Sequence, residues 1–73
     1  MMKIIKINSP FITLGQLLKY TNIIQNGGEV KFYLMENDVF INGVLDVRRG
    51  KKIYPGDIVK IKPDITLKIE SKL

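Results

Sequence analysis

The 73-residue sequence contains no cysteine and no histidine. A chain without cysteine has no disulfide framework, and one that also lacks histidine cannot build the usual zinc site. No apolar run approaches the roughly 20 residues of a membrane span, and the first residues lack the apolar core of a signal peptide. The final Ser71-Lys72-Leu73 matches a peroxisomal address, but chance explains so short a match better. We therefore expect a cytoplasmic protein without a metal site or membrane segment.

Groups suited to catalysis are also scarce. General acid–base chemistry needs histidine, or carboxylates whose surroundings separate their pKa values. The seven acidic residues are scattered along the chain, and most of them suit helix caps, helix ends or turns. Ser9 has no histidine to activate it, and Gly27-Gly28 lacks the lysine and the spacing of a phosphate-binding loop. The sequence predicts a protein that is not an enzyme and needs no cofactor or small-molecule substrate.

Positive charge is in excess and unevenly spread. Twelve lysines and arginines oppose seven acids, and residues 48–52 alone carry +4 through Arg48, Arg49, Lys51 and Lys52. A solvated basic face is one explanation of such a run, and a polyanion-binding patch is the other. Arginine forks suit phosphate oxygens, and lysines act as compact charges. Lys19 and Lys31 could extend the patch, although ordinary solvation explains either lysine alone.

The chain length and the lack of linkers predict one domain, residues 1–73, with two short helices. Thr13 and Gln16 have the spacing of a capping box, which starts a helix ending near Asn22. Its apolar stripe follows the i, i+3, i+4, i+7 pattern, with polar positions opposite. The stripe is Leu14, Leu17, Leu18 and Thr21, and the opposite side holds Gly15, Lys19 and Asn22. A second helix begins after Asn26, with Asn26 and Glu29 as its cap, and ends by Asn37.

Strands occupy the remaining segments, at residues 2–7, 39–41, 58–61 and 65–69. Asn42-Gly43 predicts a type I′ hairpin that pairs Ile41 with Val44 and Phe40 with Leu45. Pro55-Gly56 predicts a type II turn. These elements give an α+β fold in which two adjacent helices pack on a small, twisted, mainly antiparallel β-sheet.

The six aromatic residues show no base-stacking pattern, and we expect most of them in the core. Tyr54, just after the basic run, is the one that could stack on a base, although packing in the core or at its rim explains it better. The charge pattern therefore predicts a contact with folded or double-stranded RNA that is led by phosphates and reads shape.

The order of these features resembles a known family. A capped helix, a second helix, V-F-I-N-G, a basic stretch and Y-P-G-D-I-V, over residues 12–61, resemble the S-four (alpha-L) RNA-binding domain. The sequence at residues 13–19, 27–31 and 48–52 is more similar still to the small stand-alone YaaA-type proteins of bacteria. The resemblance implies an alpha-L motif that binds structured RNA, either ribosomal or transfer RNA. A ribosomal subunit during assembly is the candidate setting.

The chain departs from the family at both helix starts. Many members carry arginines at the start of the first helix and a Ser-Arg-Arg-like start to the second. Leu14-Gly15 and Asn26-Gly27-Gly28 stand at these places here. The two customary phosphate anchors are therefore empty, and residues 48–52 are expected to carry more of the affinity than in typical relatives.

Two other functions remain open. An N-G hairpin and a late G-D-I-V strand also occur in ubiquitin-like domains. The chain ends in Glu70-Ser71-Lys72-Leu73 instead of the Gly-Gly of sulfur carriers, which leaves a protein-binding adaptor as the alternative. Binding to a membrane surface ranks last, because the basic cluster does not lie on an amphipathic helix.

Overall fold

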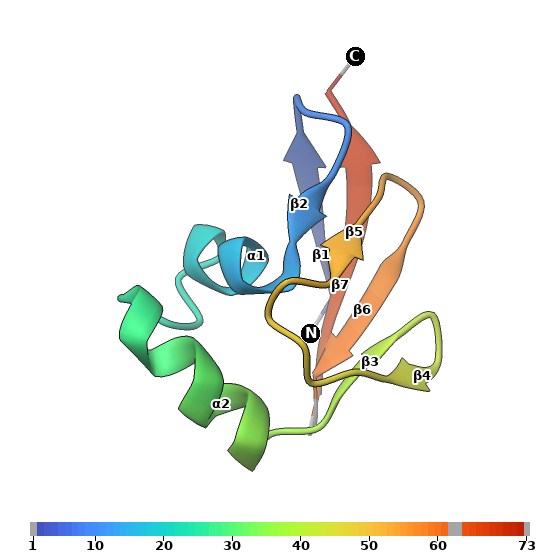
Figure 1. The fold of residues 1–73 in the computed structure, drawn as a ribbon. Coiled ribbons are helices and arrows are strands. Elements are labelled where there is room, and N and C mark those ends of the chain that lie inside the picture. The colour runs from blue at the N-terminus through green and yellow to red at the C-terminus, as the bar shows by residue number, and fades with distance from the viewer. Residues whose placement is uncertain (1, 62–63, 73) are drawn as a thin grey trace.

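The computed structural model describes residues 2–61 and 64–72, so Leu73 of the final tripeptide lies outside the described residues. The helices lie to one side of the sheet (Figure 1). The elements follow in chain order: β1 (Met2–Ile7), β2 (Ile12–Thr13), α1 (Leu14–Tyr20), the 3₁₀ turn η1 (Gly27–Glu29), α2 (Val30–Glu36), β3 (Val39–Ile41), β4 (Val44–Leu45), β5 (Lys52–Ile53), β6 (Ile58–Ile61) and β7 (Ile65–Ser71).

The main sheet of the described residues has five strands in the order β1-β7-β6-β3-β4. β6 pairs antiparallel with both β3 and β7, and β3 pairs antiparallel with β4. β1 and β7 form a parallel pair in which Met2 lies opposite Thr66 and Ile7 lies opposite Ser71. The predicted α+β class, with two short helices on a mainly antiparallel sheet, is confirmed.

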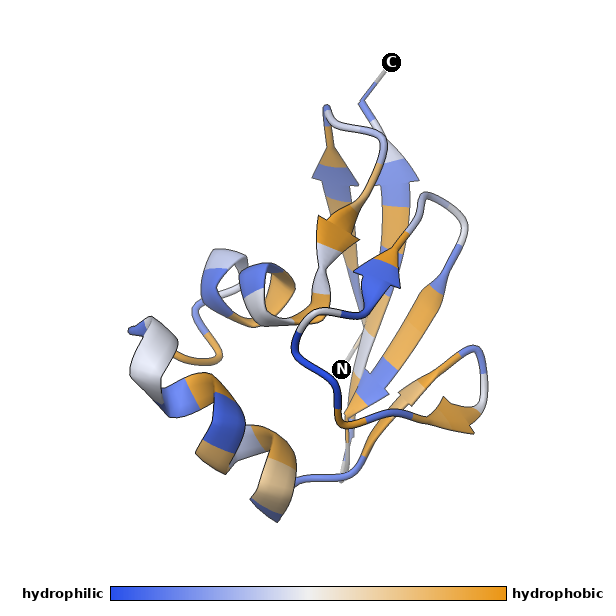
Figure 2. Ribbon diagram, in the orientation of Figure 1, coloured by the Kyte–Doolittle hydropathy of each residue, from blue (hydrophilic) through white to orange (hydrophobic). Residues whose placement is uncertain are grey.

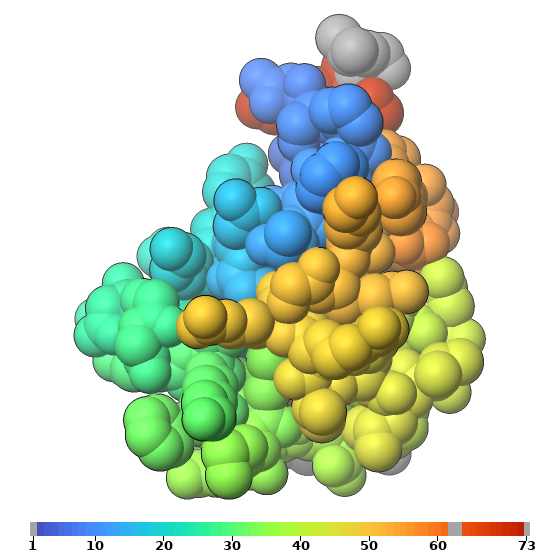
Figure 3. Space-filling model, viewed as in Figure 1, coloured from blue at the N-terminus to red at the C-terminus, as the bar shows by residue number. Residues whose placement is uncertain are grey.

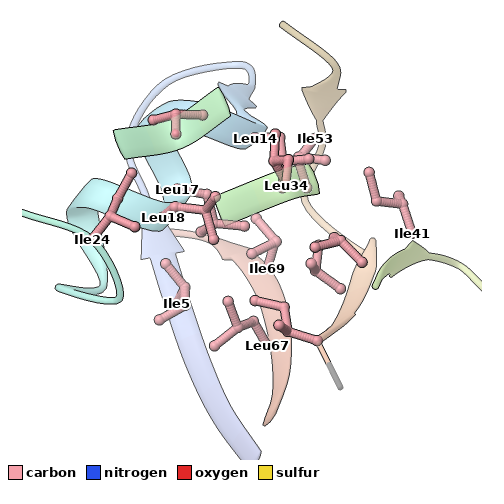
Figure 4. Packing of buried hydrophobic residues seen from close by; sticks show 14 of the residues in the cluster. Ile5, Leu14, Leu17, Leu18, Ile24, Leu34, Ile41, Ile53, Leu67 and Ile69 are labelled. Carbon is pink, nitrogen blue, oxygen red and sulfur yellow. The ribbon is translucent and has the colours of Figure 1, made fainter. Parts of the chain in front are cut away.

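The described residues share one apolar core, which lies between the helices and the sheet. Polar and apolar residues mix along the strands (Figure 2). Every second residue of β6 is buried in this core, whereas Ile58 of the same strand is exposed. Leu17 and Leu18 of α1 lie over Ile69 of β7, and all three are fully enclosed (Figure 4). Burying a side chain of this kind contributes about 1.5–3 kcal/mol relative to leaving it exposed. The core fixes which sheet face the helices cover, and so where the polar segments between them must lie.

The first helix forms as the sequence predicts. Gln16 N donates to Thr13 Oγ1 at 3.3 Å, and Thr13 N donates to Gln16 Oε1 at 3.1 Å, which completes the capping box. The helix ends at Tyr20 with Thr21 as its C-cap, and Asn22 then adopts a φ of +61°. That left-handed residue breaks the helix and turns the chain, so that Ile24 packs into the core.

The predicted cap of the second helix starts the 3₁₀ turn η1, and α2 follows directly at Val30 without a side-chain cap of its own. Asn26 Oδ1 accepts from Gly28 N at 3.1 Å, and Asn26 Nδ2 donates to the Glu29 carboxylate at 3.0 Å. Val30 and Leu34 face the core. Between them lies Tyr33, which is partly buried, and this burial raises the pKa of its phenol.

The expectation that most aromatics are core is wrong. None of the six is fully buried, and Tyr20, Phe32 and Tyr54 are exposed. α2 has only seven residues, and its inward positions are filled by Val30, Tyr33 and Leu34. Phe32 and Met35 therefore project outward, with 65% and 73% of their surfaces exposed.

The Asn42-Gly43 hairpin adopts the predicted geometry. Asn42 and Gly43 have φ values of +51° and +84°, and Ile41 pairs with Val44 and Phe40 with Leu45. The Asn42 side chain also reaches the next turn, because its Oδ1 accepts from Ile58 N and its Nδ2 donates to Asp57 Oδ1, both at 2.9 Å. A side-chain hydrogen bond thus links Asp57 to the hairpin, although Asp57 and Asn42 are 15 positions apart in sequence.

Replacing Asn42 with alanine is expected to lower the free energy of unfolding by about 2–3 kcal/mol. Each of the two lost side-chain hydrogen bonds is worth about 1 kcal/mol, and a left-handed alanine costs roughly 1 kcal/mol more. Urea denaturation measures the change. Asn42→Gly removes the same hydrogen bonds without the backbone strain, so it should cost less than alanine. An alanine variant as stable as the parent chain would show that this residue does not hold the two turns together.

Candidate functional site

The basic segment lies against the start of α1. Residues 46–51 connect β4 to β5, and Figure 3 shows this segment in gold beside the green α2. Leu14 N donates to Lys51 O at 2.8 Å, and Gly15 N donates to Arg49 O at 2.9 Å. Because the first N–H groups of α1 are bonded to carbonyls of the segment, they are not available to an external anion. The helix start instead holds the basic segment in place.

Gly15 is the residue at which α1 contacts the basic segment, and the prediction that it lies on the exposed side of the helix was wrong. The helical pattern placed it on the polar side with Lys19 and Asn22, but Gly15 is buried under the basic segment while the other two are exposed. A Cβ on Gly15 would lie 3.4 Å from Arg49 O and 3.5 Å from Val30 Cγ1. The missing side chain therefore lets the helix, the basic segment and α2 meet closely. A pattern based on one helix could not reveal a loop docked on its polar side.

Arg48 is engaged within the protein. Its Nε donates to Asp46 Oδ1 at 3.0 Å, and its Nη2 donates to Asp46 Oδ2 at 2.7 Å. The hydrogen bond from Arg48 lowers the pKa of Asp46 to about 2, so the carboxylate stays charged near neutral pH. The Arg48 side chain is 71% exposed, whereas that of Asp46 is 10% exposed. The sequence interpretation attributed most acidic residues to caps, helix ends or turns, and it missed that Asp46 neutralises a neighbouring arginine.

The other predicted cations lie at different places around the segment. Lys31 of α2 and Arg49 line the same groove, together with apolar residues of α2 and the segment. Lys51 and Lys52 line a separate hollow with Arg48 and Tyr54. The structure therefore brings five of the six predicted residues to two sides of one segment.

Lys19 belongs to neither hollow and lies beside η1, where its Nζ is 3.8 Å from the position of a Cβ on Gly27. Lys52 has an aromatic neighbour. Its Nζ lies 4.8 Å from the centre of the Phe11 ring, within the range of a cation–π contact. The Phe11 and Tyr54 rings are 5.9 Å apart and tilted by 52°. These rings come from the ends of β2 and β5, a two-stranded sheet that the sequence interpretation did not predict. Tyr54 is thus exposed at the edge of the basic region, where a stacking role is sterically open.

Among the described residues, acidic side chains do not cluster in a way that could hold a metal ion. The helices of residues 2–61 and 64–72 are also too short to cross a bilayer.

Comparison with known proteins gives two matches. A family model described as S4 domain matches residues 5–70, which confirms the resemblance to the S-four domain and extends it beyond residues 12–61. The probable ribosome maturation protein RlbA of Bacillus subtilis (strain 168) is 48% identical over 58 residues. The aligned region covers 80% of this chain and 82% of that protein. The match agrees with an alpha-L fold rather than the ubiquitin-like alternative.

Proposed function

The chain belongs to the S4 domain family, and we propose that it binds structured RNA without catalysing a reaction. The observation that carries this proposal is the basic segment itself, held against α1 by two backbone hydrogen bonds and set beside Lys31 of α2. Cations grouped around one ordered segment suit phosphate oxygens, which dominate the affinity of proteins for nucleic acids. Since the backbone of the segment is already ordered, little conformational entropy is lost when RNA binds.

The cations contribute unequally in this proposal. Arg49, Lys51 and Lys52 are the main anchors, Lys31 joins Arg49 across the groove, and Lys19 is secondary. Arg48 contributes less than its charge alone predicts, because Asp46 already accepts two hydrogen bonds from its guanidinium. Its remaining N–H groups can still reach a phosphate, since most of the side chain is exposed.

Ribosomal RNA is the proposed target, in a bacterial ribosomal subunit during its maturation in the cytoplasm. The support is the relative of similar length whose name gives a probable role in ribosome maturation. Transfer RNA is the other structured RNA that this surface would accept. We treat residues 1–73 as one RNA-binding module.

Replacing Asp46 with asparagine should strengthen RNA binding. The substitution removes one negative charge and frees the Arg48 fork, so affinity should rise by up to about eightfold at 0.1 M salt, the contribution of one additional phosphate contact. A filter-binding or fluorescence-anisotropy titration measures the change. The matched control is Glu70→Gln, because Glu70 alternates with buried Leu67 and Ile69 and faces away from the core. Equal gains in both variants would assign the effect to net charge and not to Arg48.

The target is tested by ultraviolet crosslinking in cells, followed by sequencing of the attached RNA. Crosslinks concentrated in a defined region of ribosomal RNA are expected. Crosslinks concentrated in transfer RNA would replace the proposed target. A protein partner that stays bound after nuclease treatment, with no RNA crosslinked, would favour the adaptor function instead.

A further inference from the structure

We propose that the groove between α2 and residues 46–51 receives one unpaired nucleotide of the bound RNA. Its base would lie against Leu34, Met35 and Val47, and its phosphates would lie at Lys31 and Arg49. This inference rests on the proposed RNA binding, and it adds that the protein selects RNA with an unstacked base at this point.

The groove has walls from two different elements. Lys31, Leu34 and Met35 stand at i, i+3 and i+4 on α2, which places them on one face of the helix. Val47 and Arg49 are two residues apart in the opposing segment. These five residues together line a hollow of about 420 Å³, within the size range of small-ligand sites.

The chemistry of the lining combines two properties. Met35 is 73% exposed and Val47 is 57% exposed, whereas Leu34 is buried and forms the floor. Beside these apolar surfaces lie two cations, Lys31 and Arg49. Phosphates alone would make no use of the apolar side chains. A splayed nucleotide would use both, because it presents an apolar ring face together with its phosphates, and the Arg49 guanidinium plane could also stack on the base.

Backbone hydrogen bonds hold the side of the groove that carries Arg49. Gly15 N donates to Arg49 O at 2.9 Å, and Lys51 N donates to Arg48 O at 3.1 Å. These hydrogen bonds fix the backbone on both sides of Gly50, so Arg49 leaves the segment from an ordered position. The opposing residues are fixed by α2. A groove with two ordered walls can accept a base at little cost in conformational entropy.

A protein segment is the competing occupant, because Phe32 beside the groove is also exposed. Phe32 does not line the hollow, however, and the two cations that do line it complement phosphates. The RNA occupant is therefore favoured. Phe32 then serves as the control position on the same helix.

The test compares two RNA hairpins, one fully paired and one with a single bulged 2-aminopurine. The wild-type chain should bind the bulged hairpin about tenfold more tightly, because the apolar face of the base leaves water against the side chains of the groove. The 2-aminopurine fluorescence should also change on binding. The near-isosteric double variant Met35→Gln/Val47→Thr should lose this preference and keep its affinity for the paired hairpin. Phe32→Gln should behave like the wild type.

Other outcomes separate this inference from the proposed function. Equal binding of both hairpins by the wild type, with normal salt dependence, would overturn the groove assignment and leave RNA binding intact. A Phe32→Gln variant that lost the preference as fully as the double variant would also overturn it, since the contact would then spread over the whole exposed face of α2. Failure to bind either hairpin at low salt would overturn both proposals.

Discussion

Reversing both charges that line the groove, in the variant Lys31→Glu/Arg49→Glu, is expected to weaken binding to ribosomal RNA by about 60-fold at 0.1 M salt. Each phosphate contact contributes up to about eightfold at that salt concentration through counterion release. The loss of two contacts therefore lowers the affinity by a factor of about 60, and the two new carboxylates also repel the phosphates of the RNA backbone. Anisotropy titrations of the variant and the wild type measure the difference.

A matched control separates the site from the overall charge. Lys60 of β6 and Lys68 of β7 alternate with buried residues, so both face the side of the sheet that the helices leave uncovered. Lys60→Glu/Lys68→Glu changes the net charge by the same amount and should cost less than about fivefold, through long-range attraction alone. Similar losses in the two double variants would show that binding follows net charge and would remove the basis for the proposed site.

The second large effect is expected at Gly15. A leucine there must place its outer carbons where Arg49 and Val30 already lie, because a Cβ would be 3.4–3.5 Å from their nearest atoms. Overpacking of this kind costs about 1–3 kcal/mol, a large share of the few kcal/mol available to so small a domain. The variant Gly15→Leu should also bind RNA more weakly, since the basic segment is displaced. Urea denaturation and RNA titration give the two readouts.

Two comparisons make the Gly15 prediction specific. Gly15→Ala should be neutral or slightly stabilising, since its Cβ reaches ordinary contact distance and alanine suits a helix better by about 0.5–1 kcal/mol. Gly50→Leu places the same side chain in the same segment, but the position of its Cβ has no atom within 4 Å. Its stability should change by less than about 0.5 kcal/mol. Equal destabilisation at positions 15 and 50 would contradict the close packing of the segment on α1.

The elements that the sequence predicted correctly are those whose formation depends on residues close together in the chain. The capping box of Thr13 and Gln16 and the type I′ turn at Asn42-Gly43 need only neighbouring residues, and both formed with the expected partners. The parallel pairing of β1 with β7 joins the two ends of the chain, and no local pattern specifies it. The short β2–β5 sheet was also missed. Its strands have only two residues each, which is too short for a recognisable alternation of polar and apolar residues.

For the candidate site, the sequence did not indicate how the predicted residues are surrounded. The basic run is where the pattern placed it, but the Asp46 carboxylate was not recognised as the partner of Arg48. That pairing depends on side-chain direction in a segment without regular structure. The burial of Gly15 likewise depends on a loop that returns to α1 from more than thirty positions later in the chain. That these residues contact RNA, and which RNA they contact, remains a prediction.

The central claim is that fixed cations bind RNA through its phosphates, and a salt titration tests it most directly. The association constant for a ribosomal RNA fragment is measured between about 50 and 200 mM salt, with Lys31→Glu/Arg49→Glu alongside the wild type. Contacts to about four to six phosphates predict a slope of log K against log salt between about −3 and −5 for the wild type, and a slope shallower by about 2 for the variant. A wild-type slope near zero with binding intact, or identical slopes for the two proteins, would contradict the account.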